Sequence, residues 1–299
     1  MPLVTVIIAT YNSSAALRLA LESALRQDLQ ELEVWVVGDA CTDDSAEVVS
    51  AVSDPRVRWT NLETNSGGPA RPRNEALKVA RGRYVAYLGH DDLWFPDHLS
   101  GLVDTLEATQ ADFGYSLAVC TGPNGVTSSF TIREEPLRWT RPLSPSNWLH
   151  RRDLIDRIGP FDVRVRLGDD AQFLQRVKDS GARLAFHNKL TTVKFPAETW
   201  RAYAAPGEPA QTPYARAMCE NPNRLREQLL SEAAVVLSNR DILAERSALG
   251  LKGLPRTLAI WACDLYGRQR WPLNELLYRQ WRRGAGLGAE RSRVEGKKP

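Results

Sequence analysis

The chain of 299 residues lacks several features that would place it in other classes of protein. No apolar run approaches the length of about 20 residues that a membrane-spanning helix needs, which argues against an integral membrane protein. The formal net charge is only +3, so a broadly basic nucleic-acid-binding protein is not indicated. The four cysteines form no Cys-x-x-Cys pair, which argues against a zinc site or a disulfide framework and fits a reducing compartment.

The overall composition, with 43% hydrophobic and 25% charged residues, is that of an ordinary globular protein. An apolar strand begins almost at the first residue, without the pattern of a signal peptide, so we expect a cytoplasmic location. A basic excess is confined to the end of the chain, where residues 251–299 hold eleven Lys or Arg against four Asp or Glu.

Short apolar, β-branched segments alternate with helical segments through the first 110 residues. Such segments are typical of strands buried on both faces of a sheet. We expect strands at 3–10, 32–37, 57–62 and 84–88, and helices at 15–27, 45–52, 70–80 and 96–109. The alternation predicts an α/β fold with a mostly parallel central sheet flanked by helices.

The rhythm changes after residue 110, where strands no longer alternate regularly with helices. We expect strands at 113–120, 126–132, 183–187 and 191–195, an irregular segment at 133–145, and helices at 153–158, 170–180 and 222–249. A domain boundary is predicted near Phe195. It divides a domain of residues 1–198, with halves at 1–110 and 111–198, from a helical extension at 199–299.

Two adjacent carboxylates, Asp91 and Asp92, directly follow the apolar stretch 84–88. Carboxylates at the carboxyl end of a strand in an open α/β sheet lie at the edge where ligands bind. Such a pair offers hard oxygen ligands to Mg²⁺ or Mn²⁺. The alternative is that the two residues cap the helix that follows, since Asp is a favoured N-cap residue.

Four segments resemble, in their order and spacing, the motifs of inverting family 2 glycosyltransferases with the GT-A fold. They are Val4–Asn12, Gly38–Ser45, Asn65–Asn74 and Ala80–Asp92. The resemblance covers roughly residues 2 to 195, and it implies a nucleotide-binding half at 1–110 and an acceptor and catalytic half at 111–198. It implies transfer of one sugar from a nucleoside-diphosphate sugar, with UDP- or dTDP-sugars favoured, to a hydroxyl of a saccharide or lipid-linked acceptor.

The resemblance also implies which residues contact the nucleotide. Thr10, Tyr11 and Asn12 would border the base, although they could instead form a plain turn before a helix. Asp39 would accept a hydrogen bond from the imide N–H of uracil or thymine. Arg73 would contact diphosphate or base, or would instead pair with Asp39 to brace the pocket.

The same resemblance assigns the metal site. Asp92 would hold Mn²⁺ or Mg²⁺ against the diphosphate, while Asp91 would reach the ribose or the water shell of the metal. Many members read Asp-x-Asp-Asp, whereas Gly89 stands here in place of the leading acid, so we expect weaker metal affinity.

Residues 167–176 resemble the segment Glu-Asp-x-x-Leu-x-x-Arg of the family, with Asp169 in place of the Glu. By position Asp170 would be the general base, with Asp169 as the second choice. Inversion requires a carboxylate to take the proton of the acceptor hydroxyl as it attacks the anomeric carbon. The competing interpretation is that both residues only cap a helix.

Aromatic residues near these motifs are candidates for acceptor binding, because aromatic faces stack on sugar rings. We consider Trp94, Trp139, Trp148 and His150, with core packing as the alternative. The tail 251–299 combines aromatic and basic residues, which suits an anionic membrane surface, or else a dimerisation helix. A catalytically inactive module that binds nucleotide sugar or glycan is the rival function, because two expected acids are missing.

Overall fold

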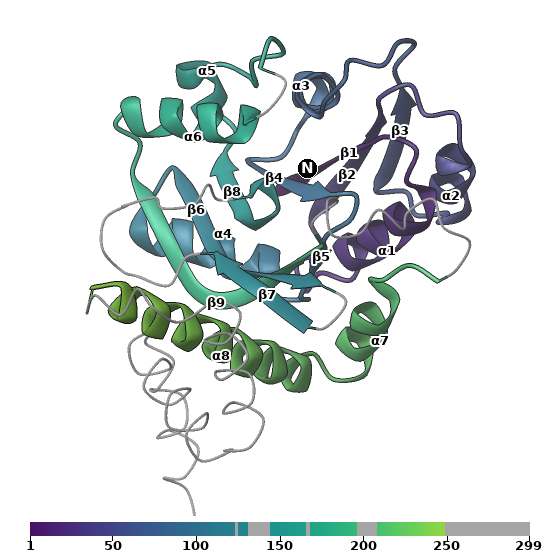
Figure 1. Ribbon diagram of the computed structural model, residues 1–299. Coiled ribbons are helices and arrows are strands. Elements are labelled where there is room, and N and C mark those ends of the chain that lie inside the picture. The colour runs from purple at the N-terminus through teal and green to yellow at the C-terminus, as the bar shows by residue number, and fades with distance from the viewer. Residues whose placement is uncertain (123–124, 131–143, 166–167, 196–207, 249–299) are drawn as a thin grey trace, which may run out of the picture.

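A sheet of nine strands organises the computed structural model, which describes residues 1–122, 125–130, 144–165, 168–195 and 208–248 (Figure 1). The strands are β1 Val4–Thr10, β2 Leu32–Gly38, β3 Val57–Asn61, β4 Tyr84–Gly89, β5 Leu93–Trp94, β6 Phe113–Gly122, β7 Gly125–Phe130, β8 Trp148–Arg151 and β9 Leu184–Lys194. The helices are α1 Ser14–Leu25, α2 Ser45–Ala51, α3 Ala70–Val79, α4 His98–Thr109, α5 Leu154–Ile158, α6 Asp169–Asp179, α7 Thr212–Glu220 and α8 Pro222–Ala248, with a 3₁₀ turn η1 at Pro145–Asn147.

The strand order is β3-β2-β1-β4-β8-β6-β9-β5, with β7 paired to β6. Strands β1 to β4 run parallel, as the alternation of apolar and helical segments predicts. Strand β8 is antiparallel to both β4 and β6, and it joins this parallel half to the rest of the sheet. Strand β9 is parallel to β6 and antiparallel to β5. The expected α/β fold with a mostly parallel central sheet is therefore confirmed, and the antiparallel pairs gather in its second half.

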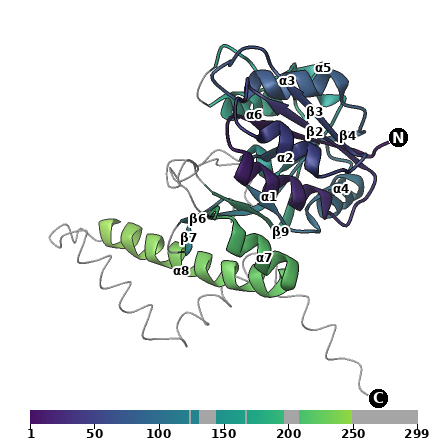
Figure 2. The same cartoon turned by 90° about the vertical axis from the view of Figure 1, so that its right-hand side faces the viewer.

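Strand β1 illustrates why the sheet is covered on both faces. Val6 and Ile8 pack into one apolar cluster together with residues of α1, α2 and α4. Ile7, which points to the opposite face, packs with residues of α3, α5 and α6. Figure 2 shows these two helix layers on either side of the parallel strands. A strand buried on both faces must be apolar at consecutive positions, which is the pattern that predicts it.

A third apolar cluster joins α7 and α8 to the second half of the sheet. Leu225 and Leu229 of α8 and Met218 of α7 pack with Val119 of β6 and Val193 of β9. The first part of the extension therefore covers the sheet (Figure 1). The domain boundary at residue 198 stays a prediction, and the aromatic and basic tail 251–299 lies outside the described residues.

One local expectation is corrected, two short strands were not expected, and one expectation is not tested. The segments 183–187 and 191–195 form one strand, β9, whose polar centre suggested a break. Strands β8 and β5 were not predicted, because four and two residues are too short to show a period. Of the segment expected to be irregular, 133–145, residues 133–143 lie outside the described residues.

Two fully buried histidines make the fold sensitive to acid. Burial lowers the pKa of His150 to about 4 and that of His98 to about 3, from 6.5. Below pH 6.5 the unfolded chain binds protons at these positions while the folded chain does not. Both histidines are therefore neutral in the fold, and lowering the pH from 7 to 5 should reduce the free energy of unfolding by about 2 kcal/mol per histidine.

Urea unfolding at pH 7, 6 and 5 measures this dependence. The variant His150→Asn should show a shallower loss of unfolding free energy on acidification, by about one proton's contribution. An equally steep loss in the variant and the wild type would contradict the assignment.

Candidate active site

The candidate site is formed at the carboxyl ends of β1, β2 and β4, together with the first turn of α6 and the end of β9. These are positions where parallel sheets bind ligands. Hydrogen bonds, ion pairs and electrostatic interactions connect the loops and strand ends of this site. They bring together residues that are far apart in the sequence.

The loops after β1 and β2 are braced against each other. Asn12 and Ala40 adopt positive φ angles of 44° and 62°, which non-glycine residues rarely adopt. The side chain of Asn12 accepts a hydrogen bond from the backbone N–H of Thr42 at 2.8 Å. Thr10 is buried, whereas Tyr11, at 49% exposed, and Asn12 are the members of the predicted trio that are open to a ligand.

Asp39 holds the loop that leads into α3. Its carboxylate accepts hydrogen bonds from the backbone N–H of Ser66 and from the Ser66 hydroxyl, at 2.9 to 3.0 Å. The residue is buried. Because each carboxylate oxygen has two lone pairs, these contacts leave acceptor capacity for a further donor.

Arg73 and Asn74 tie α3 to the segment before α6. The Arg73 guanidinium donates to Asp169 at 2.9 Å and lies 5.0 Å above the ring of Phe161. The Asn74 side chain exchanges two hydrogen bonds with the backbone of Phe161. The alternative in which Arg73 pairs with Asp39 is corrected, because the ion pair is made to Asp169.

The two acids at the start of α6 have different surroundings. Asp169 is 7% exposed and is neutralised by Arg73. Asp170 accepts the N–H of Ala171 at 2.7 Å and forms no ion pair with any residue that the structure describes. Burial, and then the neighbouring charge of Asp169, raise the pKa of Asp170, against the lowering effects of the Ala171 N–H, Arg73 and Lys194. A carboxylate with a raised pKa and no cation partner is suited to accept a proton.

Asp92 is enclosed by donors of the protein itself. It is 1% exposed, and one oxygen accepts hydrogen bonds from the Ser146 hydroxyl and from the Lys194 ammonium, the latter at 2.5 Å. The other oxygen accepts the backbone N–H of Phe195 at 3.2 Å. Burial, and then the charge of Asp92, raise the pKa of Asp91.

These residues do not fit a divalent-ion site as they are arranged. The Asp92 oxygens already accept three donors, one of them the Lys194 ammonium, whose positive charge opposes a divalent ion at the same carboxylate. Among the described residues, no group of three or more His, Cys, Asp or Glu that could hold a metal ion is found. A Cβ at Gly89 would lie 2.8 Å from an Asp92 oxygen and 2.9 Å from an Asp91 oxygen. The missing leading acid therefore has no room unless both carboxylates move.

The three acceptor candidates within the described residues are corrected. Trp94, Trp148 and His150 are buried, and their rings pack in the core rather than at the edge of the sheet. The Trp94 ring stacks on His98, and its N–H donates to the Ser146 carbonyl at 2.6 Å. The fourth candidate, Trp139, lies outside the described residues.

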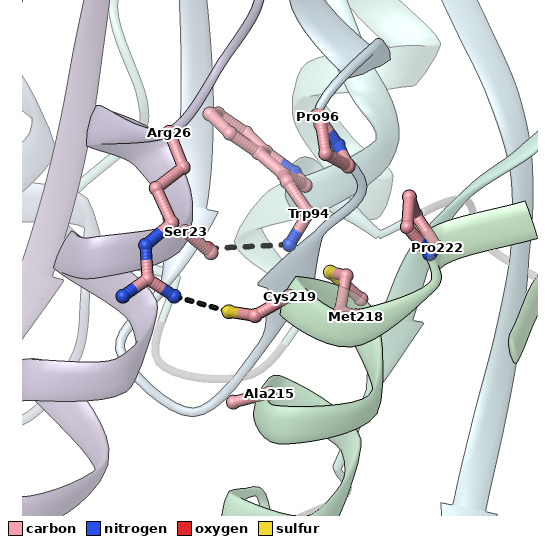
Figure 3. Close-up of a pocket in the computed structure, with 8 residues that line it drawn as sticks. All are labelled: Ser23, Arg26, Trp94, Pro96, Ala215, Met218, Cys219 and Pro222. Atoms are coloured by element: carbon pink, nitrogen blue, oxygen red, sulfur yellow. Dashed lines mark hydrogen bonds between the residues drawn. The ribbon is translucent and has the colours of Figure 1, made fainter.

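A separate pocket of about 320 Å³ lies between α1, β5 and α7 (Figure 3). It is lined by Ser23, Arg26, Trp94, Pro96, Ala215, Met218, Cys219 and Pro222. None of these residues is a carboxylate, and none belongs to the loops described above. This pocket therefore contributes nothing to the chemistry of the site.

Sequence reasoning missed Ser66, Ser146 and Lys194. The two serines stand in polar loops without a distinguishing pattern. Lys194 carried a signal, because it is a charged residue in the otherwise uncharged segment 190–195. A charge at such a position requires a partner, and here the partner is Asp92.

The comparison with known proteins is consistent with this geometry. Residues 5–168 match the family model described as glycosyl transferase family 2. The succinoglycan biosynthesis protein ExoO of Rhizobium meliloti is 31% identical over 207 residues, which cover 62% of this chain and 58% of that protein. The Escherichia coli protein WfaP, named as a UDP-Glc:alpha-D-GlcNAc-diphosphoundecaprenol beta-1,3-glucosyltransferase, is 36% identical over 117 residues, covering 39% and 46%. The chain thus spans about half the length of these relatives.

Solved structures share the fold. Staphylococcus aureus TarS in complex with UDP-GlcNAc superposes with a TM-score of 0.59 at 25% identity, over 85% of this chain and 76% of that chain. A mannosyltransferase of Pyrobaculum calidifontis, in complex with GDP-Man and Mn²⁺, gives a TM-score of 0.53 at 21% identity, over 99% and 88%. In the described part of this chain, no helix is long and apolar enough to cross a membrane.

Proposed function

Because the chain belongs to glycosyl transferase family 2, we propose that it transfers one sugar, with inversion, from a nucleoside-diphosphate sugar to an acceptor hydroxyl. UDP-sugars are the favoured donors, since the names of WfaP and of the TarS complex both contain UDP. A lipid-linked saccharide is the favoured acceptor, because WfaP is named for one. Peripheral contact with a membrane through the tail 251–299 remains a prediction.

The observation that carries the proposal is the contrast between Asp169 and Asp170. Two adjacent acids begin α6, and Arg73 neutralises only the first. The second keeps its carboxylate available, with a pKa raised by burial. A helix that needed acids only for capping would not distinguish the two in this way.

In the proposed reaction the acceptor oxygen attacks the anomeric carbon as the bond to the diphosphate breaks. Asp170 takes the proton of the acceptor hydroxyl, and the nucleoside diphosphate leaves with the electron pair of the broken bond. Asp39 and the loop that it holds, together with Tyr11, form the base side of the donor site. The described donors around Asp92 do not fit a divalent ion, so each role in this reaction is assigned to the protein's own side chains.

The direct test is release of UDP from UDP-sugars, assayed with a panel of undecaprenyl-diphosphate-linked saccharides as acceptors. We expect UDP release that depends on the acceptor, and a product whose anomeric configuration is opposite to that of the donor. UDP binding without turnover across the panel would favour the inactive binding module instead.

Replacing Asp39 should weaken the nucleotide site. In Asp39→Asn, one acceptor oxygen becomes an NH₂ donor facing the Ser66 N–H, so both the loop and the base contact are disturbed. We expect UDP affinity to fall about tenfold, by calorimetry. Asp54→Asn is a suitable control, since Asp54 pairs with Arg56 in the turn before β3. Equal UDP affinities for the two variants would contradict the role of Asp39.

A further inference from the structure

Lys194 is partly buried at the edge of the candidate site. Its side chain is 18% exposed, and its ammonium lies 2.5 Å from an oxygen of Asp92. Burying an ammonium is costly unless it is paired, and here the pairing is with the residue expected to hold a metal ion. One oxygen of the Asp92 carboxylate is thus already paired with a cation of the protein itself.

The position of this lysine follows from the sheet. Lys194 is the last residue of β9, and the preceding residues Thr192 and Val193 pair with Trp94 and Leu93 of β5. Strand β5 directly follows Asp92 in the chain, so the lysine and the carboxylate are held by neighbouring strands. The backbone of Lys194 is therefore fixed by the sheet, and its ammonium is held by the ion pair with Asp92.

The charge of Lys194 reaches beyond Asp92. Its charge also acts on Asp91 and Asp170, where it opposes the rise in pKa that burial causes. An ammonium has three N–H donors, and only one is needed for the bond to Asp92. The remaining donors suit phosphate oxygens, for which lysine acts as a point charge.

We infer that the ammonium of Lys194, rather than a divalent ion, is the cation that binds the donor diphosphate. The inference rests on the proposed function, because it assigns a role within the same donor site. Three features of the chain support it. The leading acid is replaced by Gly89, a side chain at that position would displace the Asp91 and Asp92 carboxylates, and Asp92 is paired with the lysine. In the reaction the ammonium would stabilise the negative charge that grows on the diphosphate as the bond to the anomeric carbon breaks.

UDP binding by calorimetry tests the inference without relying on turnover. The wild-type protein is titrated with UDP in EDTA and again with Mn²⁺. Lys194→Gln is titrated in EDTA, with Lys189→Gln as the matched control. Lys189 lies on the same strand and pairs with Asp97 at 2.7 Å, away from the site.

We expect wild type and Lys189→Gln to bind UDP in EDTA, with an affinity within about threefold of that in Mn²⁺. Lys194→Gln should lose about 10- to 100-fold, the effect of one charged hydrogen bond to phosphate. If Lys194→Gln does not fold, the double variant Lys194→Gln with Asp92→Asn removes the unpaired carboxylate and should show the same loss.

Two results would overturn the inference and leave the proposed function intact. They are UDP binding by wild type only when Mn²⁺ is present, and equal UDP affinities of Lys194→Gln and wild type in EDTA. If wild type binds none of UDP, dTDP and GDP, with or without Mn²⁺, the donor site itself is refuted, and the inference with it.

Discussion

Asp170→Asn should lower the rate of sugar transfer about 10²- to 10⁴-fold, while the affinity for UDP stays close to that of the wild type. The amide has nearly the same shape as the carboxylate but cannot take the proton of the acceptor hydroxyl. The measurement is initial-rate kinetics of UDP release with the acceptor, combined with calorimetry for UDP. Loss of both activity and UDP binding would place Asp170 in the donor site instead.

The matched control lies at the other end of the same helix. Asp179 ends α6, is exposed, and accepts a hydrogen bond from Gln175 at 2.8 Å. Asp179→Asn should transfer sugar at the wild-type rate. A comparable loss in this variant would indicate that α6 tolerates no change of charge, and would remove the argument for a specific base.

The raised pKa of Asp170 also predicts the pH dependence of the reaction. The base works only when ionised, so kcat/KM should fall as the pH drops through the raised pKa, which is above that of an ordinary aspartate. A folded-state pKa above the unfolded value also means that the ionised group destabilises the fold at neutral pH. Asp170→Asn should therefore unfold at the same or a higher urea concentration than wild type at pH 7.

Arg73→Gln should lower the free energy of unfolding by about 2 to 4 kcal/mol. The substitution leaves the buried carboxylate of Asp169 without its cation and removes the guanidinium from the ring of Phe161. Urea unfolding at pH 7 measures the change. Because Arg73 joins α3 to the helix that carries Asp170, activity should also fall.

A double variant separates the ion pair from the packing. Adding Asp169→Asn to Arg73→Gln removes the unpaired charge and should recover about half of the lost stability. Arg18→Gln is the control, since Arg18 pairs with Glu22 at a similar distance of 3.1 Å but on the surface, and should cost less than about 1 kcal/mol. Similar losses in Arg18→Gln and Arg73→Gln would contradict the importance of burial.

The sequence was most informative where burial imposes a pattern. Residues of β1, β2 and β4 are apolar at consecutive positions because both faces of the sheet are covered. This apolar pattern can be recognised in the sequence without a structure. For strand β9 the sequence predicts two strands instead of one, because His187 and Lys189 interrupt its apolar residues. Strand β8 is short, and its aromatic residue Trp148 was assigned to the acceptor instead of to the core.

The acids of the candidate site could be selected from the sequence, but their partners could not. Motif spacing singled out Asp39, Asp92, Asp169 and Asp170. Nothing in a motif indicates that Arg73 pairs with Asp169 or that Lys194 pairs with Asp92, because these contacts join segments about 100 residues apart. The positions of α3 and β9 in the fold determine that Arg73 pairs with Asp169 and that Lys194 pairs with Asp92.

The pairing of β5 with β9 affects how the site responds to a charged ligand. The strand residue Val193 precedes Lys194 and pairs with Leu93, which follows Asp92. Because the backbones that carry Lys194 and Asp92 are held by strand pairing, these two charges need little rearrangement when a substrate binds. Around a mobile side chain, by contrast, water molecules must reorient. The reorganisation free energy for binding a diphosphate should therefore be small, since the dipoles and charges that receive it are set when the chain folds.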